Sequence, residues 1–491
     1  MTAVEVSQET FDSLNPATDE VVGTYPVQTR EQVEEAVERA REAARWWSSL
    51  GFDGRAERLR RWNATITHRM RELCEVVQRE TGKPYGDAQL EVVLAIEHVA
   101  WAARNARKVL GRKRRSAGLL LSNHTATVEY LPLGVVGVIG PWNYPVFTPM
   151  GSITYALAAG NTVVFKPSEY TPGVGKWLVD TFAEAVPEHP VFQLVTGFGQ
   201  TGAALVGAGV DKIAFTGSTA TGKKIMAAAA ETLTPVVIEA GGKDALLVDS
   251  DADLDAAADA AVWGAFSNSG QTCIGVERVY VHERVYDSFL DKVVALTGKV
   301  RAGEQYGPMT MPSQLDVVRE HIADALAKGG RALTGGNVGE RFVEPTVLVD
   351  VPEDSDAVRE ETFGPTMTVA KVRDMDEAVE KANATRYGLA STVFSKHNGQ
   401  RLADRLRAGM TSINAPFSFA GIASLPFGGV GDSGFGRIHG PEGLREFARP
   451  KAVARQRFAV PVKLTSFTRT DKTERLVGKL VTTLHARGAK G

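Results

Sequence analysis

The sequence contains very little cysteine. Only Cys74 and Cys273 are present among 491 residues, which excludes a disulfide framework and a zinc or iron–sulfur site built from cysteines. So few cysteines suit a reducing compartment, and the first residues lack the basic-then-apolar pattern of a secretory signal. We therefore expect a cytoplasmic protein without a metal centre.

The sequence also lacks an excess of charge of one sign and a long apolar run. Its 56 Lys and Arg residues nearly balance 58 Asp and Glu residues, which gives a net charge of −2. Nucleic-acid binders usually carry a large basic excess, so we expect no nucleic-acid partner. No apolar run approaches the roughly 18 residues that a membrane-spanning helix needs.

One region departs from this balance of charge. The tail 463–491 holds seven basic residues against two acidic ones, and apolar residues recur in it at helical spacing: Leu476, Val477, Leu480, Val481 and Leu484. This pattern predicts an amphipathic helix. Such a helix packs within an oligomer of the chain, or it contacts a membrane surface or another partner.

What the chain does contain is a regular alternation of short apolar runs and longer helical segments. After a helical region from Arg30 to Leu110, apolar runs occupy 135–139, 162–166, 192–195, 212–215 and 235–239, and later 245–248, 278–282, 366–372, 391–395 and 411–414. Each run is continuously apolar, as in strands covered on both faces. The alternation predicts an α/β fold with two doubly wound parallel sheets that meet near Gly241–Gly242. Residues 119–133 predict a separate hairpin with its turn at Ser122–Asn123.

Two glycine-rich segments resemble phosphate-binding loops. Residues 197–202 match GxGxxG, but the nearest acidic residue, Asp211, comes too early to bind a ribose. Residues 217–224 nearly match a P-loop, but Lys224 replaces the hydroxyl residue that would hold magnesium. A P-loop nucleotidase is therefore disfavoured. The second segment still predicts an anion site, because a strand enters Gly217-Ser218 and a helix follows.

Cys273 is the candidate nucleophile. Small and polar residues precede it in Asn268-Ser-Gly-Gln-Thr-Cys273 and leave the thiol accessible, whereas Cys74, between Leu73 and Val76, is typical of packing. No histidine lies in a local motif with Cys273. Glu239, which ends a strand before Gly241-Gly242, is the candidate base, since α/β proteins build sites at that edge. The alternative is that Glu239 is a solvated strand end.

Together these motifs resemble the active-site signature of the aldehyde dehydrogenase superfamily. The resemblance rests on Ile238-Glu-Ala-Gly-Gly-Lys243 and Gly270-Gln-Thr-Cys273, and on five more segments in the same order: 141–145, 166–169, 215–219, 361–365 and 426–429. It covers about residues 10–460. It implies an NAD(P)-dependent, non-CoA-acylating enzyme, loosely similar to succinate-semialdehyde dehydrogenases, that forms a homodimer or homotetramer.

The resemblance also implies a role for each catalytic residue. Cys273 would attack the aldehyde carbon, and the Asn143 side chain and the Cys273 backbone N–H would stabilise the oxyanion. Hydride transfer to NAD would leave a thioester, which Glu239 would hydrolyse by activating water.

The remaining implied residues would bind the cofactor. Lys166 and Glu169 would bind the adenosine ribose, and a carboxylate there favours NAD over NADP because it repels a 2′-phosphate. The others are Trp142, Gly217, Ser218, Gly222, Glu361 and Phe363, of which Gly217 and Ser218 would hold the pyrophosphate and Glu361 and Phe363 the nicotinamide end.

On this basis we expect four regions. Residues 1–112 and 134–241 would form the Rossmann-like NAD-binding domain, and 242–423 the catalytic domain. Residues 113–133 and 424–462 would form an oligomerisation arm, and 463–491 the basic tail.

Three other functions are disfavoured. A CoA-acylating enzyme would usually lack a carboxylate like Glu239, a cysteine hydrolase would need a histidine beside Cys273, and a noncatalytic relative would have lost one of the two residues. The substrate stays open. Arg278 could anchor the carboxylate of a semialdehyde, whereas the apolar segment 417–425 suits a hydrophobic or aromatic aldehyde.

Overall fold

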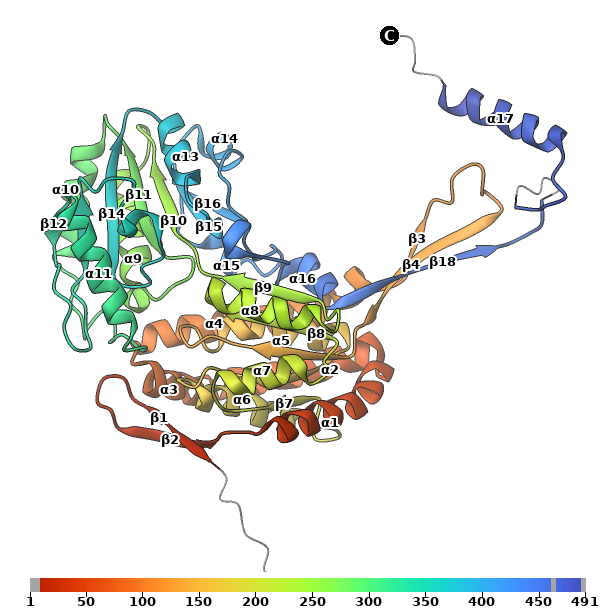
Figure 1. Cartoon of the computed structure of the whole chain (residues 1–491), viewed down its shortest axis with the longest axis horizontal. Coiled ribbons are helices and arrows are strands. Elements are labelled where there is room, and N and C mark those ends of the chain that lie inside the picture. Colours follow the sequence, from red (N-terminus) through yellow and green to blue (C-terminus); the bar gives the residue numbers. More distant parts are fainter. Residues whose placement is uncertain (1–8, 461–464, 487–491) are drawn as a thin grey trace, which may run out of the picture. The chain divides into compact units, whose positions relative to one another are not determined.

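The computed structural model describes residues 9–460 and 465–486. Within them the chain separates into two compact units. The first unit extends to Leu110 and resumes from Leu131 to Arg449, and the second contains Gly111–Tyr130 and the chain from Pro450 onward. Figure 1 labels the helices and strands of both units.

The first unit begins with an antiparallel hairpin and four helices. Strands β1 (Thr10–Leu14) and β2 (Val21–Pro26) pair with each other. The helices are α1 (Arg30–Ser49), α2 (Gly51–His68), α3 (Met70–Thr81) and α4 (Tyr85–Leu110). The helical region predicted from Arg30 to Leu110 is thus confirmed.

A six-stranded sheet follows, in the order β17-β9-β8-β5-β6-β7. Its five inner and edge strands from β5 to β9 run parallel, and only β17 is antiparallel. The strands are β5 (Val135–Ile139), β6 (Thr162–Lys166), β7 (Phe192–Leu194), β8 (Lys212–Gly217), β9 (Val236–Ala240) and β17 (Gly434–Phe435). The helices between them are α5 (Phe147–Ala159), α6 (Pro172–Ala185), α7 (Gly199–Gly207) and α8 (Thr219–Ala230).

A seven-stranded sheet completes the first unit, in the order β12-β13-β14-β11-β10-β15-β16, and only β12 is antiparallel. Its strands are β10 (Asp244–Val248), β11 (Val276–His282), β12 (Arg331–Thr334), β13 (Thr346–Val349), β14 (Thr366–Val372), β15 (Ala390–Phe394) and β16 (Met410–Ile413). Its helices are α9 (Leu254–Phe266), α10 (Tyr286–Thr297), α11 (Gln314–Ala327), α12 (Asp356–Arg359), α13 (Met375–Asn383) and α14 (Gly399–Ala403). The predicted α/β fold with two largely parallel sheets is confirmed.

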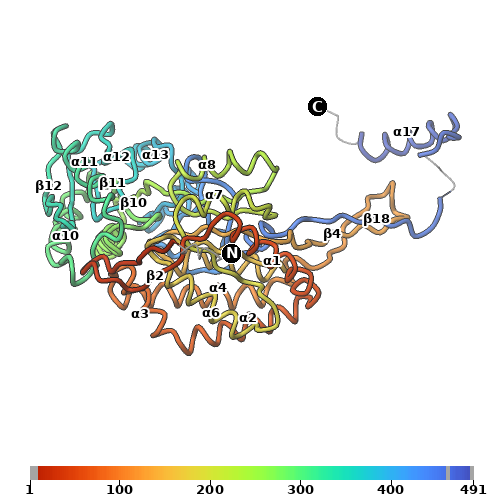
Figure 2. Tube along the Cα trace, turned by 60° about the horizontal axis from the view of Figure 1, so that its bottom comes forward, coloured from red at the N-terminus to blue at the C-terminus, as the bar shows by residue number. Residues whose placement is uncertain are grey.

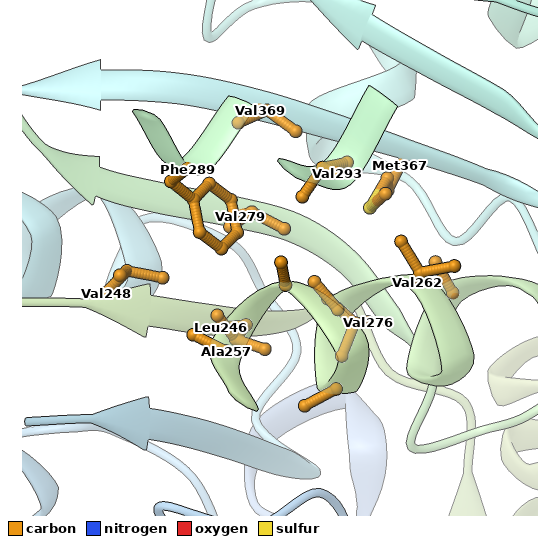
Figure 3. Close-up of a cluster of buried hydrophobic side chains, with 14 of the residues drawn as sticks. Leu246, Val248, Ala257, Val262, Val276, Val279, Phe289, Val293, Met367 and Val369 are labelled. Carbon is orange, nitrogen blue, oxygen red and sulfur yellow. The ribbon is translucent and has the colours of Figure 1, made fainter. Parts of the chain in front are cut away.

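The core of this second sheet explains why its strands are continuously apolar. One face of β10, β11 and β14 packs against α9 and α10, as Figure 3 shows for Leu246, Val279 and Phe289. Small residues of α9, such as Ala257, let the helix approach the sheet closely. The other face buries Leu247 and Tyr280 against α13. Strands buried on both faces must be apolar throughout.

The second unit contains a three-stranded sheet in the order β18-β4-β3 and a terminal helix (Figure 2). These elements are β3 (Lys113–Arg115), β4 (His124–Pro132), β18 (Ala448–Gln456) and α17 (Asp471–His485). The predicted hairpin exists, but the expectation that Leu119–Leu121 form its first strand was wrong. These leucines lie in the turn, and β3 is the strand that pairs with β4. Within the range 424–462 expected for the arm, β17 joins the six-stranded sheet and β18 the three-stranded one.

No helix in the described part of the chain is both long enough and apolar enough to cross a lipid bilayer.

Candidate active site

Cys273 lies in a loop held in an unusual backbone conformation. The loop leaves α9 through a short 3₁₀ segment, Ser267–Gly270, in which Asn268, Ser269 and Gly270 have φ angles of 51°, 58° and 68°. Non-glycine residues rarely adopt this left-handed region, and its energetic cost requires support from the surroundings. That support comes from side chains of the loop itself: Asn268 donates from Nδ2 to the Asn143 carbonyl at 3.0 Å, and Ser269 donates to the Gly307 carbonyl at 2.6 Å.

Gly270 also brings a second segment against this loop. A Cβ atom at Gly270 would lie 2.0 Å from the carbonyl oxygen of Gly364, so only glycine fits. The segment Glu361–Pro365, which the sequence placed in the site, therefore packs directly on the residues that precede Cys273.

Asn143 is positioned by the same loop. Its side-chain Nδ2 donates to the Gln271 carbonyl at 2.9 Å, and its backbone carbonyl accepts from Lys83 Nζ at 2.7 Å. Gln271 in turn accepts at Oε1 from the Thr310 backbone N–H at 2.8 Å. An amide has two donor hydrogens, so Asn143 can serve the loop with one and an oxyanion with the other.

Glu239 is the penultimate residue of strand β9 and lies beside the predicted anion site. In the parallel pairing of β8 and β9 it lies opposite Thr216, one residue before Gly217. Its side chain is buried and neither carboxylate oxygen has a hydrogen-bond partner among the described residues. Burial raises the pKa of Glu239 to about 8, against a weaker opposing effect of the Arg437 charge. The alternative of a solvated strand end is thus wrong, and a perturbed carboxyl of this kind is typical of a functional site.

Cys273 and Glu239 line one cavity of about 210 Å³. Burial, and then the charges of Glu239 and Glu361, raise the pKa of the Cys273 thiol. The thiol therefore stays protonated at neutral pH until a base accepts its proton. Cys74, by contrast, is completely buried on α3, as expected for packing.

A second cavity, of about 540 Å³, lies at the carboxyl ends of β5, β6 and β8. Five of the residues expected to bind the cofactor line it: Trp142, Lys166, Glu169, Gly217 and Ser218. Ser218 is the N-cap of α8, and its hydroxyl accepts from the Thr221 backbone N–H at 3.3 Å. Free N–H groups at such a helix start suit an anion.

The other three expected cofactor residues lie outside the lining of this cavity. Gly222 packs α8 onto β9, where a Cβ would lie 2.9 Å from Ile238. Glu361 is buried and accepts at Oε1 from the Gly242 backbone N–H at 2.9 Å. Phe363 stacks edge-on against Trp142, with ring centroids 5.6 Å apart, and so supports the cavity wall indirectly.

Some residues at the two cavities escaped the sequence analysis. Gly199, Gly202 and Lys224 line the larger cavity, and all three lie in the glycine-rich segments that we had noted but not selected. Two buried ion pairs, Lys83–Glu91 and Lys243–Glu277, brace the loops around Cys273. No local sequence pattern marks such pairs, because folding alone brings their partners together.

Arg278 does not face the cavity of Cys273. Its guanidinium is buried and donates to backbone carbonyls, at 2.6 Å to Lys243, 3.0 Å to Ala382 and 3.1 Å to Lys381. All its directed donors are therefore used inside the protein. The suggestion that Arg278 anchors a substrate carboxylate was wrong.

Known proteins resemble this chain over most of its length. The aldehyde dehydrogenase family matches residues 3–453. The 4,4'-diapolycopene aldehyde oxidase of Methylomonas sp is 38% identical over 92% of this chain and 87% of its own. A Mycobacterium ulcerans protein named "Putative succinate-semialdehyde dehydrogenase [NADP(+)] 2" is 38% identical over 88% of this chain and 86% of its own.

Solved structures of other proteins also resemble this chain. An NAD-dependent aldehyde dehydrogenase from Sinorhizobium meliloti superposes with a TM-score of 0.89 at 33% identity, covering 93% of each chain. An E. coli NADP-dependent enzyme superposes with a TM-score of 0.87 at 32% identity, covering 91% of this chain and 95% of its own. The family matches nearly the whole length of this chain, and a cysteine and a buried carboxyl line one cavity. The chain therefore belongs to the aldehyde dehydrogenase family.

Proposed function

We propose that the chain oxidises an aldehyde to a carboxylic acid through a thioester on Cys273, with NAD as the preferred hydride acceptor and water as the acyl acceptor. The observation that carries this proposal is that Cys273 and Glu239 line the same cavity. A nucleophile and a base in one enclosed space are the minimum that such a two-step reaction needs.

The first step belongs to Cys273. Its sulfur forms a bond to the aldehyde carbon, and the carbonyl oxygen becomes an oxyanion. The second amide hydrogen of Asn143 and the Cys273 backbone N–H would stabilise that charge, at roughly 3 kcal/mol for each donor. The proton of the thiol must leave, and ionised Glu239 is the acceptor that lines the cavity. Glu239 must release this proton to solvent before it can act as the base in the second step.

The second step belongs to Glu239. Loss of hydride from the thiohemiacetal leaves a thioester on Cys273, and Glu239 takes a proton from the water that attacks it. Acid and free thiol are the products. Because burial raises the pKa of Glu239 to about 8, this carboxyl is mostly protonated at neutral pH. The ionised base that the second step needs therefore becomes abundant only at alkaline pH.

The larger cavity fits a dinucleotide. The start of α8 offers backbone N–H groups to a pyrophosphate, and Glu169 places a carboxylate 4.0 Å from Lys166 Nζ on the same wall. Bound NAD would supply the hydride acceptor. Relatives of both cofactor preferences exist, so the argument for NAD rests on Glu169, which would accept a bond from a 2′-hydroxyl and repel a 2′-phosphate.

Glu169→Ser should narrow the preference for NAD over NADP. Removing the carboxylate removes the repulsion while Lys166 and Lys224 remain on the same cavity wall. We expect kcat/KM with NADP to rise by roughly tenfold or more, as for loss of one charge repulsion of about 1.4 kcal/mol. Initial rates of NADH and NADPH formation, measured without CoA, test both the cofactor and the acyl acceptor. A native enzyme that prefers NADP, or that needs CoA, contradicts the proposal.

The resemblance to aldehyde dehydrogenases is also the basis for our proposals on oligomeric assembly and cellular location. We propose a homodimer or homotetramer in which the strands of the second unit contribute to contacts between subunits. The three-stranded sheet ends in β3 and β18, and sheet edges of this kind readily pair with another chain. A cytoplasmic location stays a prediction.

A further inference from the structure

The cavity that holds Cys273 has an almost wholly apolar wall. Its side chains come from α4, α9, the start of α5 with the loop before it, the segment 416–421 and the residues on either side of β17. They include five aromatic residues: Tyr144, Phe147, Trp263, Phe417 and Phe427. Leu90, Leu94 and Ile274 fill the gaps between these rings. Walls of this composition bind ligands mainly by removing apolar surface from water.

The same wall offers no free positive charge. No Lys or Arg is among its lining residues, as far as the described part of the chain shows. Lys83, which lies behind the wall, is buried, pairs with Glu91 at 3.0 Å and lies over the Tyr144 ring at 4.3 Å. Lys83 Nζ donates to Glu91 and to the Asn143 carbonyl, and Lys83 itself is not among the residues that line the cavity.

The polar groups of the wall reinforce this conclusion. Glu91 is fully engaged, since its carboxylate also accepts from the backbone N–H groups of Val146 and Phe147, at 2.6 and 3.1 Å. Buried His439 has no hydrogen-bond partner among the residues that the structure describes. Burial, together with the charge of His98, lowers its pKa well below the usual value, so it stays neutral. The two glutamates that line the cavity, Glu91 and Glu239, cannot supply a positive charge either.

Apolar surface continues at the mouth of the cavity. Leu90 and Trp263 are 44% and 40% exposed although they line it. Ile422 and Leu425, which follow the lining segment, are also largely exposed. A substrate that fills the cavity can therefore extend an apolar chain over these side chains.

We propose that the substrate is an uncharged apolar aldehyde, with an aliphatic or aromatic body, and that this wall excludes aldehydes that carry a carboxylate. The proposal rests on the function proposed above. Transfer of a carboxylate into an apolar space without a partner is costly, whereas each added methylene gains about 0.8 kcal/mol, or about fourfold in affinity.

The experiment compares aldehydes of increasing chain length with succinic semialdehyde. We expect kcat/KM to rise about fourfold per methylene until the cavity is full, and pentanal to exceed succinic semialdehyde by roughly a hundredfold. If no aldehyde reduces the cofactor, the proposed function itself fails. If aldehydes react but succinic semialdehyde equals or exceeds pentanal, only the substrate proposal fails.

A second experiment adds a cation to the cavity wall. Leu90→Arg should raise the ratio of kcat/KM for succinic semialdehyde to that for pentanal by roughly tenfold to a hundredfold, the value of a hydrogen bond to a charged group. Leu90 is partly exposed, so the longer side chain can be accommodated. The matched control is Leu326→Arg, on α11, where the leucine is also 44% exposed but does not line the cavity. An unchanged ratio in Leu90→Arg would overturn the proposal.

A separate observation concerns the tail helix α17. It has no buried residue, and Leu476, Leu480, Val481 and Leu484 are 37% to 55% exposed along one face. Lys472, Arg475 and Lys479 lie at positions i, i+3 and i+7, on a different face. The predicted amphipathic helix is thus confirmed, and within unit 2 nothing described covers its apolar face.

The charge of the second unit complements an acidic surface. Although the whole chain is nearly neutral, residues 111–130 and 450–491 hold 14 Lys and Arg residues and only three acidic residues. Exposed leucines have no use on a nucleic-acid backbone, and lysines are depleted in interfaces between proteins. An apolar stripe beside lysines and an arginine is typical of helices that lie in the surface of an anionic bilayer.

We infer that α17 docks on an anionic lipid surface. The full chain should sediment with vesicles that contain phosphatidylglycerol but not with vesicles of phosphatidylcholine alone, and high salt should weaken the binding. Leu480→Glu should reduce the bound fraction at least about tenfold, since it places a charge in the apolar face, whereas the control Leu326→Glu should not. Absence of vesicle binding by the native chain, or equal binding by Leu480→Glu, would overturn the inference. The inference would also fail if the native chain did not bind vesicles while Leu480→Glu changed the oligomeric mass, because that result would assign the helix to a contact with a second copy.

Discussion

Cys273→Ala should abolish turnover while the protein still binds NAD. The side chain that forms the covalent bond is lost, and removal of a nucleophile typically lowers kcat by roughly 10⁶-fold. The cofactor cavity does not include Cys273 among its lining residues, so the dissociation constant of NAD should stay within a few-fold. Steady-state NADH formation and calorimetric titration with NAD measure the two quantities.

The chain offers a matched control for this substitution. Cys74 is completely buried on α3, outside both cavities, so Cys74→Ala should keep the native kcat and lose only about 1 kcal/mol or somewhat more of stability through the small void. If Cys273→Ala retained turnover, or if Cys74→Ala lost it, the assignment of the nucleophile would have to be abandoned.

Glu239→Gln should stop the reaction after one turnover. The amide keeps the shape of the side chain but cannot take a proton from water, so acyl enzyme should accumulate on Cys273. We expect one equivalent of NADH per active site in a rapid burst, followed by a steady rate that is lower by about 10² to 10⁴. Stopped-flow absorbance records both phases, and intact-mass spectrometry should show the acyl adduct.

Glu80→Gln is the control for replacing a buried glutamate with a raised pKa elsewhere. Burial raises the pKa of Glu80 to about 7, and its carboxylate accepts from the Gly173 and Val174 backbone N–H groups, away from the cavity of Cys273. Its variant should keep the native kcat. A steady rate in Glu239→Gln equal to the native rate would mean that another group performs the hydrolysis.

The dependence of the hydrolysis rate on pH tests the role of Glu239 independently. Because the native pKa of Glu239 is raised to about 8, the ionised base is scarce at pH 6 and predominates at pH 9. The rate of hydrolysis should therefore rise with pH, with a midpoint near 8, and the rise should disappear in Glu239→Gln. A native profile that is flat between pH 6 and 9 contradicts a role for this carboxyl as the base.

The sequence predicted the buried strands of the two parallel sheets well and the exposed segments poorly. Runs such as Val135–Ile139 are apolar at every position because helices cover both faces of the strand, so their pattern identified them. The leucines at 119–121 looked equally strand-like, yet they lie exposed in a turn. Local composition does not reveal what a segment packs against. The same reason explains why the half-exposed strands β1 and β2 were not predicted.

The residues of the site were also predictable only where a local sequence signal marks them. Cys273, Glu239 and the Gly217-Ser218 turn carry local signals and lie at the cavities as expected. Lys83, Glu91 and Glu277 support them from distant parts of the chain, and their pairing depends on the assembled fold. The pKa of Glu239 also depends on that fold, because only complete burial raises it.

The left-handed run at Asn268–Gly270 has a practical consequence. It fixes the loop of Cys273 against the Gly364 carbonyl, with no room for even one added carbon atom. Leu90 and Phe417, by contrast, reach the same cavity from a helix and a partly exposed segment. An engineer who wishes to retarget the enzyme should therefore leave the reactive loop untouched and diversify these two elements, since selectivity and reactivity reside in separately mutable parts of the chain.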